Sequence, residues 1–116
     1  MHPGVSILIT AHNEEENIEG AVRSVLGQDY PNLEVIVISD GSEDGTVGVL
    51  EQFSHEDLRV YDQEKRGRVE SLNRGVDLAD GEFIAILDAD DRSLPGRIEK
   101  QARFLREHRA VGVVGA

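Results

Sequence analysis

Hydrophobic residues along this chain fall into short uninterrupted runs, which alternate with segments where apolar residues recur every three or four positions. A short run rich in Val and Ile is typical of a strand buried on both faces of a sheet. Such runs predict strands at residues 5–10, 33–39, 59–62, 82–87 and 110–116. The run at 59–62 is the weakest prediction, because it contains Arg and Asp.

The segments between the runs have the spacing of amphipathic helices. In the first segment, the apolar face is formed by Ile18, Val22, Val25 and Leu26. We expect Asn13 to be the N-cap of this helix and Glu16 its capping-box partner, with the helix ending at Gly27. Three further helices are predicted: a short one through Val47, Leu50 and Phe53, one through Val69, Leu72, Val76 and Ala79, and one that opens at Ser93 and Pro95 and carries Ile98, Ala102 and Leu105.

Strands that alternate with helices favour an α/β fold, with a Rossmann-like, mainly parallel sheet and helices on both faces. A chain of 116 residues is expected to form one domain, residues 1–116. Polar clusters follow three of the predicted strands, at residues 10–14, 39–45 and 88–91. The carboxyl ends of parallel strands share one edge of the sheet, so these clusters should meet in a ligand-binding crevice.

Charge and composition narrow the possible partners. Asp and Glu number 23 against 12 Lys and Arg, and this net charge of −11 argues against a nucleic-acid partner. No apolar run is long enough to cross a membrane, and the first residues lack the features of a signal peptide. The absence of Cys excludes disulfides and thiolate metal sites. We therefore expect a protein located in the cytoplasm or at the cytoplasmic face of a membrane.

Known nucleotide and calcium motifs give little support to several alternative functions. The chain has neither G-x-G-x-x-G after the first strand nor G-x-x-x-x-G-K-[ST], so an NAD-type oxidoreductase or a P-loop NTPase is not expected. Residues 40–51 resemble a calcium-binding loop, with Asp40 at its first position and Glu51 at its twelfth. An EF-hand needs a helix before that loop, whereas residues 33–39 are predicted to form a strand. A calcium-binding module is therefore kept only as a less favoured alternative.

Three carboxylates stand close together where the fourth long apolar run ends, at Asp88, Asp90 and Asp91. Like charges this close repel one another unless a cation or a helix N-terminus compensates them. An acid just before the helix at Ser93 would stabilise the start of that helix. This does not account for Asp88 and Asp90 together, and such oxygen ligands are the kind that hard divalent cations prefer.

The order of the motifs VSILITAHNEEENI, SVLGQDYPNLEVIVISDGSEDGT and GRVESLNRGVDLADGEFIAILDADD resembles the family 2 glycosyltransferases, which have a GT-A fold. The resemblance covers nearly the whole chain and corresponds to the nucleotide-sugar-binding portion of that family. It implies that DADD is the family's D-x-D motif. Asp88 would then face the ribose side of the nucleotide, and Asp90, together with Asp88, would hold Mn²⁺ or Mg²⁺ at the diphosphate.

The resemblance also implies which residues contact a nucleoside-diphosphate sugar, with a UDP-sugar the expected donor. They are Ala11, His12, Glu14, Asp40, Arg68, Asn73, Asp88, Ala89 and Asp90. His12 stands where the family has an aromatic residue near the base, and Asp40 matches the acid that contacts the base. Several of these positions also have a plainer interpretation. His12 could be an exposed loop residue, Glu14 a first-turn helix charge, Asp40 a turn former, Arg68 a solvated helix start, and Asn73 a residue that orients the local backbone. Ser39 and Thr10 depart from the family, which has an acid and a proline at these positions.

The expected reaction is inverting transfer of a sugar from its nucleoside diphosphate to an acceptor hydroxyl. Family members run well beyond 116 residues, so the catalytic base is expected beyond Ala116 and this chain is interpreted as part of a longer domain. The uncovered sheet edge after the last strand is expected to favour a homo-oligomer. A nucleotidyltransferase is a second alternative. It would carry a Gly-rich basic loop after the first strand, where this chain has the acidic TAHNEEE.

Overall fold

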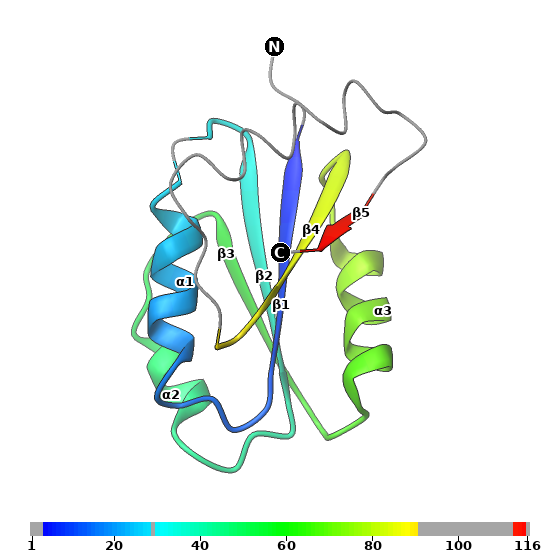
Figure 1. Ribbon diagram of the computed structural model, residues 1–116. Coiled ribbons are helices and arrows are strands. Elements are labelled where there is room, and N and C mark those ends of the chain that lie inside the picture. The colour runs from blue at the N-terminus through cyan, green and yellow to red at the C-terminus, as the bar shows by residue number, and fades with distance from the viewer. Residues whose placement is uncertain (1–3, 29, 91–112, 116) are drawn as a thin grey trace.

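In the part of the chain that the structure describes, five parallel strands form one sheet (Figure 1). The computed structural model describes residues 4–28, 30–90 and 113–115. Within them the strands are β1 (Val5–Ala11), β2 (Leu33–Asp40), β3 (Leu58–Gln63), β4 (Phe83–Asp88) and β5 (Val113–Gly115), and the order across the sheet is β3-β2-β1-β4-β5. The helices are α1 (Ile18–Leu26), α2 (Thr46–Glu51) and α3 (Arg68–Leu78). The predicted α/β fold with a parallel sheet is confirmed.

Helices cover both faces of the sheet, with α1 and α2 on one side and α3 on the other (Figure 1). The central strand β1 shows the consequence, because its side chains alternate between two cores. Ile7 and Ile9 pack into the core beneath α1 and α2, whereas Leu8 packs with Ile36 and Ile38 on the α3 side. Burial on both faces explains why the strands read as continuous apolar runs.

The start of α1 differs from the sequence prediction. The helix begins at Ile18 with Asn17 as its N-cap, so the assignment of Asn13 and Glu16 as a capping box is wrong. Asn13 has a left-handed backbone with φ of 53°, and its side-chain oxygen accepts a hydrogen bond from Glu43 N at 2.8 Å. The side chain that could have capped the helix is therefore used to bind the loop after β2.

Helix α3 packs on the sheet through small residues rather than through its valines. Ser71 and Gly75 are buried, while the side chains of Val69 and Val76 are 72% and 44% exposed. A Cβ atom on Gly75 would lie 3.0 Å from both methyl carbons of Leu8, so glycine allows the helix to approach β1 closely. The apolar spacing predicted the helix correctly. Of its predicted apolar face, Ala79 packs against the core, whereas Val69 and Val76 are exposed.

The C-terminal elements are described only in part. β5 pairs with β4 in parallel, with Ile84 opposite Val113, as the predicted fifth strand requires. The helix predicted from Ser93 lies outside the described residues, as does Asp91. Among the helices that are described, none has the length and apolar character needed to cross a lipid bilayer.

A polar network closes the sheet at the amino ends of the strands. Glu34 accepts hydrogen bonds from the Ser6 hydroxyl, from Asp80 N at 2.6 Å and from the Arg59 guanidinium at 2.7 Å. Burial by itself would raise the pKa of Glu34, but these donors outweigh it and lower the pKa below its ordinary value. The ionised carboxylate therefore joins β1, β2, β3 and the turn after α3.

Replacing Glu34 with Gln is expected to lower the free energy of unfolding by about 1.5–3 kcal/mol at pH 7, the range for hydrogen bonds to a charged group. Because the folded-state pKa of Glu34 is lowered, its contribution is present above the unfolded-state pKa and is lost as pH falls through the folded-state value. Urea unfolding at pH 7 and pH 3 should show the difference between wild type and variant shrinking at low pH. Glu19→Gln, on an exposed carboxylate paired with Arg23, should change little at either pH.

Candidate functional site

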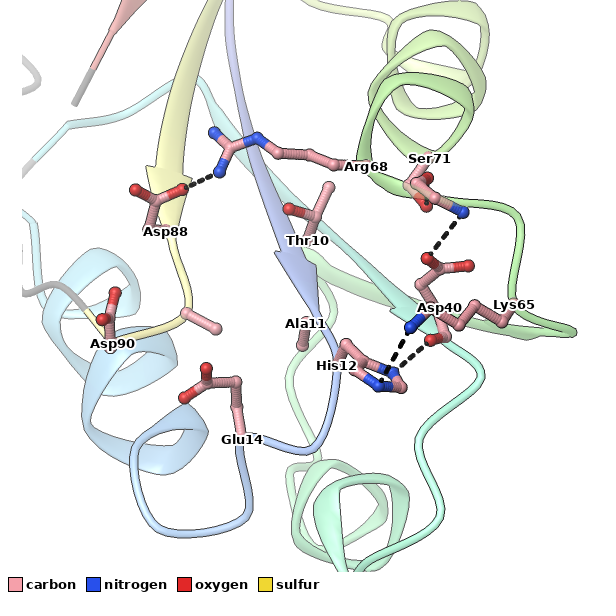
Figure 2. Close-up of a pocket in the computed structure, with 12 residues that line it drawn as sticks. Thr10, Ala11, His12, Glu14, Asp40, Lys65, Arg68, Ser71, Asp88 and Asp90 are labelled. Carbon is pink, nitrogen blue, oxygen red and sulfur yellow. Dashed lines mark hydrogen bonds and ion pairs between the residues drawn. The ribbon is translucent and has the colours of Figure 1, made fainter.

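A cavity of about 430 Å³ opens at the carboxyl ends of the central strands, where the polar clusters were expected to meet. Figure 2 shows its lining, which comes from the ends of β1, β2 and β4, the loop after β3 and the start of α3. The described lining residues are Thr10, Ala11, His12, Glu14, Asp40, Lys65, Gly67, Arg68, Ser71, Asp88, Ala89 and Asp90. Segments far apart in sequence therefore form one site, as the parallel topology requires.

The two carboxylates of the predicted metal motif lie at one side of this cavity. Asp88 ends β4 beside Thr10 of β1, and Asp90 follows after the buried Ala89. An Arg68 nitrogen lies 2.8 Å from a carboxylate oxygen of Asp88 (Figure 2). This ion pair places a cation from α3 beside the acidic strand end and partly compensates its negative charge.

The donor set at this strand end fits a hard divalent cation. Among the described residues, no group of three or more His, Asp or Glu side chains is arranged to hold a metal by itself. Mg²⁺ in nucleotide sites is usually bound by one or two carboxylates, with phosphate oxygens and water completing its shell. Two carboxylates that face a cavity are therefore enough protein ligands for such a site, and Asp88 and Asp90 are the residues that would provide them.

Asp40 organises the loop that leads from β3 to α3. Its carboxylate accepts hydrogen bonds from the Gln63 side chain at 3.0 Å, from Arg66 N at 2.7 Å and from Gly67 N at 3.0 Å. Burial by itself would raise the pKa of Asp40, but these bonds outweigh it and lower the pKa below its ordinary value. Asp40 lines the cavity as expected, and its contact with a nucleobase stays a prediction.

The next residue, Gly41, brings this loop still closer to β2. Its φ of 65° lies in the left-handed region, and its N–H donates a hydrogen bond to Gln63 O at 2.8 Å. A Cβ atom on Gly41 would stand 2.6 Å from the Lys65 Cβ and 2.8 Å from the Lys65 nitrogen. Only glycine permits this approach, so the end of β2 determines where Lys65 lies.

His12 lies at the side of the cavity opposite Asp88 and Asp90, next to Lys65 (Figure 2). Its Nδ1 is 2.8 Å from the backbone oxygen of Asp40, and its Nε2 is 3.5 Å from the ammonium of Lys65. The ring is exposed, in agreement with a loop histidine, but it is held by these contacts. His12 therefore links the loop after β1 to the loop after β3.

The loop after β1 is joined to the loop after β2 by reciprocal hydrogen bonds. Glu14 N donates to the Thr46 hydroxyl at 2.9 Å, while Gly45 N donates to the Glu15 carboxylate at 2.7 Å. The Glu14 side chain, which lines the cavity, also accepts a bond from Asn17. These contacts set the position of Glu14 at the cavity edge.

The same contacts argue against the calcium-loop alternative. A strand, β2, precedes Asp40, where an EF-hand would have a helix. The Asp40 carboxylate points to the loop after β3, and Asp44 accepts hydrogen bonds from Thr46 and Glu15. The side chains that would bind calcium are therefore used in holding three loops together.

One predicted contact lies away from the cavity, and several lining residues were not predicted. Asn73 is exposed on α3 and does not line the cavity, so its role in nucleotide binding stays a prediction without geometric support. The sequence analysis did not assign Thr10, Lys65, Gly67 or Ser71 to the site. The turn residue Gly67 beside the charged stretch 64–66 was a signal for a loop, but only the pairing of β3 with β2 brings that loop to the cavity.

Sequence comparison identifies relatives of known family. The family model described as Glycosyl transferase family 2 matches residues 6–116. The putative teichuronic acid biosynthesis glycosyltransferase TuaG of Bacillus subtilis is 37% identical over 108 residues, which cover 90% of this chain and 43% of that protein. The poly-beta-1,6-N-acetyl-D-glucosamine synthase of Staphylococcus epidermidis is 38% identical over 89 residues, covering 75% of this chain and 22% of that protein.

Solved structures show the same fold. S. aureus TarS 1–349 in complex with UDP-GlcNAc matches with a TM-score of 0.83 and 29% identity, over 91% of this chain and 32% of that one. The mannosyltransferase PcManGT from Pyrobaculum calidifontis, in complex with GDP-Man and Mn²⁺, matches with a TM-score of 0.75 and 32% identity, over 90% of this chain and 32% of that one. The chain thus spans less than half the length of each of these proteins.

Proposed function

We propose that this chain, which belongs to glycosyl transferase family 2, binds a nucleoside-diphosphate sugar together with a divalent cation as the donor-binding step of glycosyl transfer. The observation that carries the proposal is the cavity in which Asp88 and Asp90 lie beside Arg68, at the carboxyl edge of the parallel sheet. Two structural neighbours support it, since TarS is solved with UDP-GlcNAc and PcManGT with GDP-Man and Mn²⁺.

The residues of the cavity have complementary roles in this proposal. Asp88 and Asp90 would hold the cation, Mn²⁺ or Mg²⁺, and Arg68 would lie beside the diphosphate. When bound, the cation neutralises negative charge that develops on the leaving diphosphate. Glu14 and the backbone at Ala11 would line the nucleotide site, while Asp40 keeps the loop after β3 in place.

The proposed reaction is inverting transfer of the sugar to an acceptor hydroxyl. In that reaction a base removes the hydroxyl proton as its oxygen attacks the anomeric carbon, and the nucleoside diphosphate leaves. No described residue of the cavity is assigned as that base. The position of the base beyond Ala116, the cytoplasmic location and the homo-oligomer all stay predictions.

A nucleotidyltransferase is the less favoured reading. Such an enzyme would be expected to present a Gly-rich basic loop to the phosphates after the first strand. Here that loop contains Glu14, Glu15 and Glu16, and its backbone N–H groups at Glu14 and Glu15 already donate to Thr46 and Asp44. The loop therefore offers few free donors to a triphosphate.

The proposed function is tested by calorimetric titration of UDP into the protein. In Mn²⁺ we expect binding at least about tenfold tighter than in chelator, because the acidic cavity repels a diphosphate unless a cation lies between them. UDP affinity that is indifferent to chelator would overturn the metal-dependent proposal. Titration with Ca²⁺ alone tests the calcium-module alternative, and tight calcium binding without nucleotide would favour it.

A further inference from the structure

The lining of the cavity contains two basic side chains among the described residues, and they lie apart from one another. Arg68 pairs with Asp88 at 2.8 Å, on the side of the predicted metal motif. Lys65 lies on the other side with His12 and Asp40, and Thr10 and Ala11 lie between the two (Figure 2). The comparisons and the family resemblance assign nothing to Lys65.

The hydrogen bonds of His12 determine how its ring can act. The backbone oxygen of Asp40 can only accept, so the His12 Nδ1 at 2.8 Å must carry a hydrogen and donate it. In the neutral ring, Nε2 is then an acceptor. Two donor groups lie near it, the Lys65 ammonium at 3.5 Å and the Asn13 amide nitrogen at 3.4 Å. His12 is therefore a positioning residue, whose acceptor directs the ammonium of Lys65.

The backbone around Lys65 is also held in place, by hydrogen bonds and by a close contact. Asp40 accepts the N–H groups of Arg66 and Gly67, the two residues that follow Lys65. On the other side, Gly41 approaches Lys65 so closely that a Cβ atom would stand 2.6 Å from the Lys65 Cβ. The loop thus presents one ammonium at a defined place on the cavity wall.

We infer that Lys65, directed by His12, selects the nucleobase of the donor and favours bases that carry a carbonyl at the edge facing it. This inference rests on the proposed function: Lys65 lies across the cavity from Asp88 and Asp90, so a nucleotide whose diphosphate is held there would extend its nucleoside towards Lys65. An ammonium has three donors and no acceptor. Uracil O4 and guanine O6 are acceptors, whereas cytosine N4 and adenine N6 are amino donors. Lys65 can therefore bind uracil and guanine but meets a donor on cytosine and adenine.

The test is calorimetric titration of UDP, GDP, CDP and ADP in Mn²⁺, with wild type and two matched variants. Lys65→Met keeps the length of the side chain and removes its donors. Arg66→Met removes the same charge from the neighbouring residue, whose side chain is not part of the cavity lining. For wild type we expect UDP and GDP to bind about tenfold more tightly than CDP and ADP, the effect of one charge-assisted hydrogen bond in a partly exposed site.

Lys65→Met is expected to weaken UDP and GDP about tenfold and to leave the other two nearly unchanged, so that the preference disappears. Arg66→Met should change all four affinities by the same small factor. His12→Ala, which removes the acceptor that directs Lys65, should reduce the ratio of UDP affinity to CDP affinity. A purely structural role for His12 would instead weaken all four nucleotides together.

The outcomes separate this inference from the proposed function. If wild type binds none of the four nucleotides in Mn²⁺, the proposed function fails. If wild type binds UDP but shows no preference over CDP, the inference is overturned while the proposed function stands. A uniform loss of affinity for all four in Lys65→Met also overturns the inference, because Lys65 would then act on the diphosphate that they share.

Discussion

Asp90→Asn is expected to abolish manganese-dependent binding of UDP while the fold remains intact. Asp90 is exposed at the edge of the cavity, so the substitution keeps the shape of the side chain and removes one negative charge. Loss of a direct metal ligand should exceed the roughly 10–100-fold cost in metal affinity that removing an outer hydrogen-bond partner produces. Titration of UDP in Mn²⁺ and in chelator measures the effect, and circular dichroism checks the fold.

Asp57→Asn provides the matched control, because it removes the same charge from an exposed residue at the opposite end of the sheet, beside the amino end of β3. Its UDP affinity in Mn²⁺ should equal that of wild type within about twofold, since exposed charges farther apart than a Debye length are largely screened. Equal UDP affinity in Asp90→Asn and wild type would sink the metal assignment. The acidic strand end would then return to its plainer interpretation, stabilisation of the start of the helix predicted from Ser93.

Gly41→Ala is expected to lower the free energy of unfolding by about 2–5 kcal/mol. A left-handed backbone costs an alanine about 1–2 kcal/mol, and overpacking a close contact typically adds about 1–3 kcal/mol. The contact is with the backbone and Cβ of Lys65, which cannot swing away as a flexible side-chain end could. The same displacement moves the loop held by Asp40, so UDP affinity should fall with stability.

Gly48→Ala is the control substitution, and it is expected to raise the free energy of unfolding where Gly41→Ala lowers it. Gly48 lies within α2, and a Cβ atom there would meet nothing within 4 Å. Alanine should therefore raise stability by up to about 0.5–1 kcal/mol, the usual difference between the two residues inside a helix. Urea unfolding of both variants measures the pair. A Gly41→Ala protein as stable as wild type would show that the loop after β3 does not depend on this close approach.

Much of the fold follows from local pattern in the sequence. The runs at residues 5–10 and 33–39 predicted β1 and β2 because a strand buried on both faces favours apolar, β-branched residues at successive positions. The position of the candidate site could be predicted as well. Asp40 and Asp88 end their strands, and His12 and Asp90 follow within two residues of a strand end. Parallel strands place these carboxyl ends at one edge. Family resemblance then suggested a role for each.

Other features depend on contacts between residues far apart in the chain, which no local pattern encodes. Asn13 had the sequence signature of a helix cap, yet it binds Glu43 across the site because the loops after β1 and β2 meet there. The apolar spacing of α3 suggested a face that includes Val69 and Val76, but both are exposed. Gly75 packs against Leu8 instead, because only a residue without a Cβ lets the helix approach the strand so closely.

Lys65 shows most directly which features the sequence determines by itself and which depend on tertiary contacts. By itself the sequence determined the alternating elements, the parallel sheet and the edge at which acidic residues gather, because burial and strand direction follow from residue type and order. Tertiary structure alone decided that Lys65 stands on the cavity wall. Its place depends on the hydrogen bonds of Asp40, the left-handed backbone of Gly41 and the acceptor of His12, which come together only when β3 pairs with β2.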